Sequence, residues 1–227
     1  MRLTVVTYNV RGFRDGPDRI ARLVSRFEPD VLLLNETGGR LALRRFARAT
    51  GMEVAGDPWS PFRRRVKDAV LARAPWHIVS SLQRRFPTEE WLYPRGALVA
   101  ELRRGGARIH AVATHLSLKP AERRRHAEAL AEIVRRLHTP AVIAGDLNEF
   151  PDGKAVTLLG TRFRDVWLLA GGADGATFPA DRPSSRIDYV FVTEGIGVER
   201  ALVPGGADAH DASDHRPVVA VLTLPEA

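Results

Sequence analysis

Short apolar runs recur along this chain, and polar residues able to bind a cation or a phosphate stand at their ends. The clearest run, 140–144, is followed by Gly145-Asp146-Leu147-Asn148. Side chains alternate along a strand, so Asp146 and Asn148 are expected on one side of the backbone. The polar residues at such ends are Asn9, Glu36, His115, Asp146, Asn148, Asp188, Asp214 and His215. This pattern is typical of a hydrolytic site at the edge of a sheet.

The 227 residues are enough for one domain with a substantial core, which we expect to span 1–227. No apolar run approaches the roughly 20 residues of a membrane span. Residues 3–8 already read as a strand rather than a signal peptide. Without cysteine, a metal must be held by oxygen and imidazole, which favours Mg²⁺ or Mn²⁺. We expect a cytoplasmic protein, with a monomer favoured.

A net charge of +7 favours a polyanionic partner such as nucleic acid. Lysine contributes little to it, because the chain has only Lys67, Lys119 and Lys154, and arginines supply the rest. An arginine bias is equally typical of a skewed coding composition. Charge alone therefore leaves nucleic-acid binding and an ordinary solvated surface equally open.

Periodicity predicts mixed sheets covered by helices. Apolar residues at helical spacing, such as Ile20, Leu23, Val24 and Phe27, predict the first helix. The expected helices cover 17–27, 39–49, 120–138 and 154–159. The expected strands cover 2–8, 30–35, 69–74, 76–82, 96–103, 107–115, 140–145, 187–193, 197–203 and 216–224. Strand–helix–strand order followed by hairpins favours an α/β sandwich of two sheets flanked by helices.

Six ordered motifs resemble those of the endonuclease/exonuclease/phosphatase superfamily. They are Thr7-Tyr8-Asn9-Val10-Arg11-Gly12, Leu34-Asn35-Glu36, Thr114-His115-Leu116, Gly145-Asp146-Leu147-Asn148-Glu149, Arg186-Ile187-Asp188-Tyr189 and Ser213-Asp214-His215-Arg216-Pro217. The superfamily includes deoxyribonucleases, AP endonucleases, neutral sphingomyelinases, inositol polyphosphate 5-phosphatases and deadenylases. The resemblance implies a four-layered α/β/β/α sandwich of two mixed sheets and Mg²⁺-dependent cleavage of phosphate esters.

Departures from the motifs indicate which branches of the superfamily the chain resembles. Arg11 stands where AP endonucleases carry an acidic residue, and Ser184-Ser185 replace the tryptophan that precedes their Arg-Leu-Asp-Tyr segment. An AP endonuclease is therefore disfavoured. His115 instead resembles the deoxyribonuclease, sphingomyelinase and phosphatase branches. Asn35 replaces the commoner glutamine before Glu36, which keeps the metal ligand but changes its neighbour.

Phosphodiester cleavage needs an oriented water, neutralised phosphate charge and a proton for the leaving oxygen. Glu36 is the expected metal ligand, Asn9 can bridge a cation and a phosphate oxygen, and Asp214 would help to hold the cation. Asp146 and Asn148 would position the water and a non-bridging oxygen. An Asx turn is the competing interpretation of this pair.

An Asp188–His215 pair would fix the tautomer of the ring and favour its protonated form. Whether His215 accepts a proton from water or donates to the transition state stays open at this point. His115 would stabilise the transition state or assist the leaving group. Arg95 resembles a phosphate-binding arginine of the deoxyribonuclease branch, and Arg11 is a second candidate for that role.

The sequence therefore favours a Mg²⁺-dependent, nuclease-like phosphodiesterase acting on nucleic acid. One alternative is a small phosphoester or a lipid headgroup. The sequence shows no evident hydrophobic insertion loop for a lipid, and the aromatic segment 58–62 is the candidate tip. The other is a catalytically silent nucleic-acid-binding module. Such a module would be expected to lack at least one of the catalytic residues, and all of them are present.

Overall fold

The computed structural model describes residues 1–57, 64–88, 94–172 and 174–225, and the segment 58–62 lies outside them. Its strands form two sheets of six described strands each. The first sheet contains β1 (Arg2–Asn9), β2 (Val31–Asn35), β3 (Glu53–Gly56), β4 (Ala69–Ala72), β11 (Gly197–Leu202) and β12 (Val218–Thr223), in the order β11-β12-β1-β2-β4-β3. The second sheet contains β5 (His77–Arg85), β6 (Gly96–Arg104), β7 (Ala107–His115), β8 (Ala141–Asp146), β9 (Arg164–Asp165) and β10 (Asp188–Val192), in the order β5-β6-β7-β8-β10-β9.

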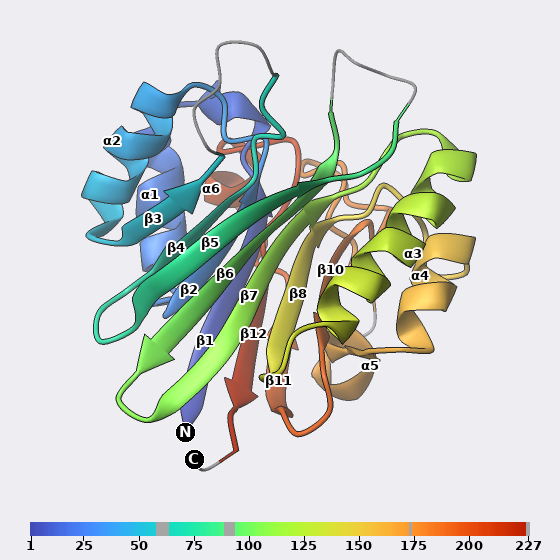
Figure 1. Ribbon diagram of the computed structural model, residues 1–227. Helices are drawn as coiled ribbons and strands as arrows, with labels where there is room; N and C mark the ends of the chain where they lie inside the picture. The colour runs from blue at the N-terminus through green and yellow to red at the C-terminus, as the bar shows by residue number, and fades with distance from the viewer. Residues whose placement is uncertain (58–63, 89–93, 173, 226–227) are drawn as a thin grey trace.

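Both sheets are mixed, because β1 and β2 run parallel in the first and β7 and β8 run parallel in the second. Helices cover the outer faces, as Figure 1 shows. The helices are α1 (Pro17–Ser25), α2 (Arg40–Thr50), α3 (Pro120–Arg135), α4 (Lys154–Gly160), α5 (Val166–Ala170) and α6 (Ala207–His210), with a 3₁₀ turn at Arg11–Phe13. The result is the expected α/β/β/α sandwich.

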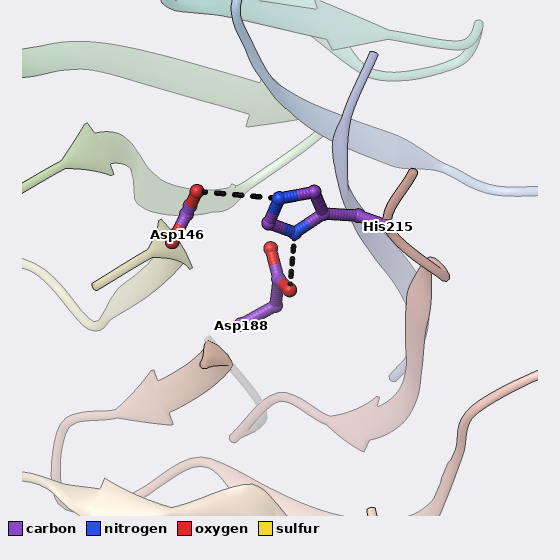
Figure 2. Close-up of side chains that lie close together, drawn as sticks. All are labelled: Asp146, Asp188 and His215. Atoms are coloured by element: carbon purple, nitrogen blue, oxygen red, sulfur yellow. Dashed lines mark hydrogen bonds and ion pairs between the residues drawn. The ribbon is translucent and has the colours of Figure 1, made fainter. Parts of the chain in front are cut away.

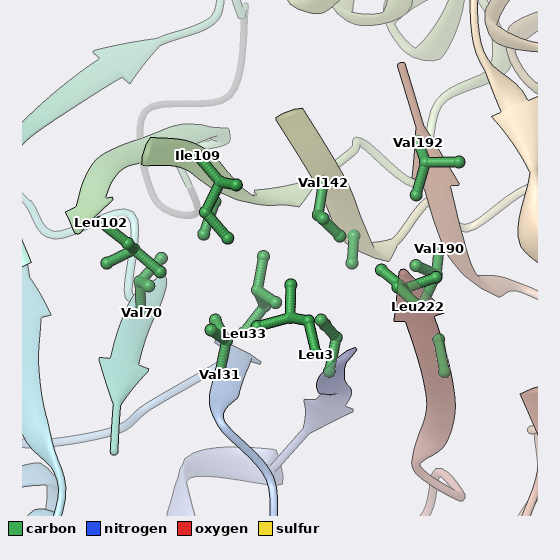
Figure 3. Packing of buried hydrophobic residues seen from close by; sticks show 14 of the residues in the cluster. Leu3, Val31, Leu33, Val70, Leu102, Ile109, Val142, Val190, Val192 and Leu222 are labelled. Atoms are coloured by element: carbon green, nitrogen blue, oxygen red, sulfur yellow. The ribbon is translucent and has the colours of Figure 1, made fainter. Parts of the chain in front are cut away.

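Three apolar clusters hold the layers together. The central one lies between the two sheets and includes the residues drawn in Figure 3, among them Leu3, Leu33, Ile109 and Val142. A second cluster joins the outer face of the first sheet to α1 and α2, and a third joins the second sheet to α3 and α4. Burial of apolar surface on both faces explains why the central strands are almost continuously hydrophobic.

The central cluster also determines where the polar strand ends point. In β1, Leu3 and Val5 face the other sheet, so the same alternation turns Asn9 inward. In β8, Val142 and Ala144 face inward, and the alternation therefore carries Asp146 inward as well. Strand pairing then brings these ends to one edge, since Asn9 is opposite Asn35, and Asp146 is opposite both His115 and Asp188. The site is thus the polar end of the inter-sheet core.

The predicted elements agree with the structure in order, with differences at their ends. Helix α3 ends at Arg135 rather than at 138, and β12 begins at Val218 rather than at 216. The short elements β3, β9, α5 and α6 had no sequence prediction. They contain only two to five residues, too few for periodicity to be distinctive. No helix in the described part of the chain is long and apolar enough to span a membrane.

We predict that Gly145→Ala destabilises the protein, because β7 and β8 approach too closely to admit a side chain there. A Cβ atom at Gly145 would lie 1.9 Å from the carbonyl oxygen of Thr114. Overpacking of this kind costs roughly 1–3 kcal/mol, and occasionally more. Urea unfolding followed by circular dichroism measures the loss.

Gly160→Ala is the matched control, because a Cβ at the end of α4 would meet no atom within 4 Å. That variant should be neutral or more stable by up to about 1 kcal/mol. Equal stabilities of the two variants would show that β7 and β8 can separate without cost.

Candidate active site

A buried carboxylate, Asp146, lies at the centre of the polar edge. Its Oδ2 accepts a hydrogen bond from Asn9 Nδ2 at 3.0 Å, and its Oδ1 accepts one from the backbone N–H of Asn148 at 2.9 Å. Two imidazoles face the same oxygen, with His115 Nε2 at 3.3 Å and His215 Nε2 at 3.7 Å from Oδ2. Asp146 thus connects side chains from both sheets.

The surroundings keep Asp146 ionised despite its burial. Burial by itself raises the pKa of a carboxyl group, because it disfavours the charged form. Here His115 and His215, together with the N–H of Asn148, outweigh that effect and hold the pKa of Asp146 below its usual value. A carboxylate that stays ionised can accept a hydrogen bond from a water.

His215 stands between two carboxylates, as Figure 2 shows. Its Nδ1 lies 2.9 Å from Asp188 Oδ2, while its Nε2 faces Asp146. Burial lowers the pKa of the ring, but Asp188 and then Asp146 and Asp214 raise it further, to about 10. The surrounding carboxylates therefore favour the protonated form of the ring, and its Nε2 faces Asp146.

Asp188 is held in place by more than its pairing with the ring. It begins β10, its side chain is almost completely buried, and its backbone N–H donates to Thr177 Oγ1 at 3.4 Å. Its Oδ1 has no hydrogen-bond partner in the described part of the chain. The single well-formed contact of this carboxylate is therefore directed at His215, as the sequence predicted.

A second imidazole, that of His115, ends β7 and is also buried. Arg95 Nη1 approaches both ring nitrogens, at 2.6 Å from Nδ1 and 2.9 Å from Nε2. Asn148 Nδ2 lies 3.0 Å from Nε2. The predicted phosphate-binding arginine is thus in direct contact with the predicted catalytic histidine.

The backbone conformation that brings Asn148 into the site differs from the predicted strand geometry. Strand β8 ends at Asp146, and Asn148 lies beyond it with a left-handed backbone, φ 50°. Its N–H bonds to Asp146 Oδ1, which is the Asx turn of the competing interpretation. Its Nδ2 also donates to Leu116 O at 3.1 Å. The Asx turn is therefore part of the site, because it places the side-chain amide of Asn148 against His115.

Asn35 links the two sheets directly below the site. Its Nδ2 donates to Asp68 Oδ1 at 2.8 Å and to Thr114 O at 2.9 Å, and its Oδ1 accepts from the backbone N–H of Asp146 at 3.0 Å. The amide therefore joins β2 and the start of β4 to β7 and β8. Asn35, which stands where glutamine is commoner, therefore joins the two sheets in addition to changing the neighbour of Glu36.

Sequence reasoning missed Asp68 altogether. Its side chain is fully buried, and its Oδ2 has no partner in the described part of the chain. Burial raises its pKa well above the usual range. A sequence signal was available: Val70 and Ala72 face the inter-sheet core, and the same alternation turns Asp68 inward.

Glu36 is separate from the Asp146 cluster. It follows β2 with φ 54°, is half-buried, and lines a small cavity together with Arg11, Lys67 and Arg95. Its carboxylate makes no hydrogen bond or ion pair within the described residues. An unpartnered, half-buried carboxylate is suited to binding a cation.

Asp214 and Arg11 form a pair at the outer side of the site. Arg11 Nε lies 3.3 Å from Asp214 Oδ2, and both side chains are partly exposed. The backbone N–H of Arg11 donates to Asn9 Oδ1 at 3.1 Å. The predicted phosphate-binding residue thus forms an ion pair with a predicted metal ligand in this structure.

The structure brings most of the predicted residues into one chain of direct contacts. That chain consists of Asn9, Arg95, His115, Asp146, Asn148, Asp188 and His215. Arg11 joins it through the Asn9 side chain, and Asp214 joins it through Arg11. Glu36 faces the adjoining cavity.

Comparison with known proteins agrees with this geometry. The model of the Endonuclease/Exonuclease/phosphatase family matches residues 6–215. The uncharacterised protein YbhP of Escherichia coli K12 is 28% identical over 162 residues, which are 69% of this chain and 62% of YbhP. The chain therefore spans less than two thirds of the length of this relative.

Solved structures share the fold over nearly the whole chain. An endonuclease/exonuclease/phosphatase from Bacteroides vulgatus has a TM-score of 0.85 at 20% identity, covering 99% of this chain and 100% of its own. The mannosyl-6-phosphatase Bt3783 of Bacteroides thetaiotaomicron has a TM-score of 0.80 at 22% identity, covering 98% and 100%. TDP2 of D. rerio complexed with single-strand DNA product has a TM-score of 0.80 at 18% identity, covering 98% and 99%.

These structural likenesses, all below 25% identity, establish the fold. The family match rests on sequence and covers every polar strand end described above, from Asn9 to His215. The chain belongs to the endonuclease/exonuclease/phosphatase family.

Proposed function

We propose that the protein is a divalent-cation-dependent phosphodiesterase that cleaves nucleic acid with an activated water. Members of its family are hydrolases that act on phosphoesters. The observation that carries the proposal is the pairing of an ionised, buried Asp146 with a protonated His215 backed by Asp188. These groups supply a proton acceptor and a proton donor side by side, which is what in-line attack by water on a phosphate requires.

The residues present fit a hard cation such as Mg²⁺, with Mn²⁺ as an alternative. Glu36 offers an unpartnered carboxylate, Asn9 offers an amide oxygen with a second lone pair, and Asp214 offers a partly exposed carboxylate. All three are the oxygen ligands that Mg²⁺ prefers, and the chain has no cysteine to favour a softer metal. When bound, such a cation supplies positive charge that stabilises the phosphate in the transition state.

The roles of the protein groups follow from their protonation. Asp146, ionised and facing the site, would accept a proton from the attacking water, with Asn148 holding a non-bridging oxygen. His215, protonated, would donate its Nε2–H to the charge that develops on the phosphate. Of the two roles that the sequence left open for His215, the proposal takes donation. His115, with Arg95 against its ring, would assist the leaving oxygen.

Nucleic acid is favoured as the substrate by charge near the site. The net charge is +7, and five cationic side chains line the cavity beside Glu36. A small phosphoester is the second candidate, since the same fold includes the mannosyl-6-phosphatase. The binding-only alternative is opposed by the complete set of catalytic side chains.

We predict cation-dependent nicking of supercoiled plasmid that is lost in EDTA. His215→Ala should lower the rate by about 10²-fold or more, the usual scale for a positioned acid–base group. His138→Ala is the control, because His138 is an exposed histidine outside the site. A near-wild-type rate in His215→Ala would contradict the assignment, and hydrolysis confined to aryl phosphates or sugar phosphates would favour the second candidate.

We also predict that Glu36→Gln weakens Mg²⁺ binding by at least about tenfold, because it removes an anionic ligand while keeping the volume of the side chain. Isothermal titration calorimetry with Mg²⁺ measures the change. Glu199→Gln, on an exposed glutamate of β11, is the matched control. An unchanged affinity in Glu36→Gln would exclude Glu36 from the ligand set.

Asp188→Asn should lower the pKa of His215, because it removes the nearest negative charge from the ring. NMR titration of the cation-free protein should show the wild-type ring protonated until about pH 10. The midpoint in the variant should fall by at least about one pH unit, the scale of a neighbouring opposite charge. Equal titration midpoints for His215 in the wild type and in Asp188→Asn would show that Asp188 does not stabilise the imidazolium. The exposed His138 serves as an internal reference.

A further inference from the structure

A small cationic cavity adjoins the catalytic cluster beside Glu36. Its walls come from the segments that follow β1 and β2 and from those that precede β4 and β6. Its volume of about 160 Å³ is below the roughly 300–1,000 Å³ of cavities that hold drug-sized ligands. It therefore suits a small group such as a phosphate rather than a whole nucleoside. The cationic residues lining it are Arg11, Arg14, Arg65, Lys67 and Arg95.

Two of these cations are already neutralised by carboxylates. Arg11 pairs with Asp214, and Arg65 Nε lies 3.2 Å from Asp57 Oδ2. The other three, Arg14, Lys67 and Arg95, make no ion pair with a carboxylate among the described residues. Glu36 is the one acidic residue among those described in the lining, and in the proposed function its charge is used by the cation. The cavity therefore has positive charge in excess.

Unusual backbone conformations hold the lining in place. Arg11, Glu36 and Lys67 have φ values of 45°, 54° and 67°, which non-glycine residues rarely adopt. Such conformations persist where the surroundings impose them, and they cluster at functional sites. Backbone hydrogen bonds join the three segments, from Gly12 N to Glu36 O at 2.7 Å and from Thr37 N to Lys67 O at 2.9 Å. Groups held in this way lose little freedom when a ligand binds.

The cavity is continuous with the catalytic cluster on two sides. Arg95 contacts His115, and the backbone N–H of Arg11 bonds to the side chain of Asn9. Arg95 and Arg11 therefore line the cavity and also contact the cluster, whereas Arg14 and Lys67 line the cavity as exposed side chains. An anion beside Arg14 and Lys67 would be a neighbour of the scissile phosphate and not the scissile phosphate itself.

We propose that this cavity is a second anion subsite, in which Arg14 and Lys67 bind the phosphate next to the scissile one on the same nucleotide chain. The proposal rests on the proposed function and specifies its substrate as one carrying at least two phosphates. Arginine and lysine bind phosphate by charge-assisted hydrogen bonds, and successive phosphates are the regular feature of a nucleic-acid backbone.

The test compares ligands with one and two phosphates. Thymidine 3′,5′-bisphosphate and the two thymidine monophosphates are titrated calorimetrically with Mg²⁺ into the His215→Ala protein, so that no ligand is consumed. We expect the bisphosphate to bind at least about tenfold more tightly than either monophosphate. Adding Lys67→Met should reduce this ratio to below about threefold, as should Arg14→Met in a separate protein. Both side chains are exposed and make no ion pair with another described residue, so their loss should leave the fold intact.

Arg103→Met is the matched control. Arg103 is an exposed cation near the turn between β6 and β7, at the end of the sheet opposite the site. Its loss should leave the ratio unchanged. A bisphosphate that binds no more tightly than the monophosphates, or a ratio that survives both Lys67→Met and Arg14→Met, would overturn the subsite. The experiment measures binding and not cleavage. A protein that cleaves no phosphodiester would therefore refute the proposed function, while the binding ratios would still show whether the second anion subsite exists.

Discussion

The structure depends on the compensation of one buried negative charge. Asp146 lies between the sheets at their polar edge, where an unpaired carboxylate would be strongly unfavourable. Asn9, the N–H of Asn148 and two imidazoles compensate it, and each comes from a different segment. The same contacts that make the charge tolerable also place a proton acceptor beside a proton donor. The stability of the sheet edge and the geometry on which the proposed function rests therefore have a common origin at this residue.

The two-sheet fold makes this convergence possible. Residues that alternate inward form the central core, and the alternation continues into polar side chains at the last position of each strand. Strand register then places Asn9, His115, Asp146 and Asp188 at one edge. Asn35 joins the two sheets next to these residues through hydrogen bonds to both sheets. The loops around this edge contain the residues that line the cationic cavity.

Much of this could be predicted from sequence, because apolar runs, their order and their polar ends are local signals. The sandwich and the pairing of Asp188 with His215 follow that pattern, whereas the contact of Arg95 with His115 was not predicted. Asp68 was missed because its neighbours suggested a loop, although strand alternation would have turned it inward. Strand alternation was extended beyond the predicted strand to Asn148, whereas its left-handed backbone follows from the turn. The pairing of Arg11 with Asp214 depends on tertiary structure and has no local signature.

A crystal structure with Mn²⁺ and a phosphorothioate dinucleotide, located by anomalous scattering, would show whether cation and phosphate bind as proposed. We expect a manganese ion bound by the Glu36 carboxylate. We also expect the scissile phosphorus between Asp146 and His215, with one phosphate oxygen within hydrogen-bond distance of His215 Nε2. A manganese ion absent from Glu36, or a dinucleotide phosphate bound away from the Asp146–His215 pair, would contradict the proposal.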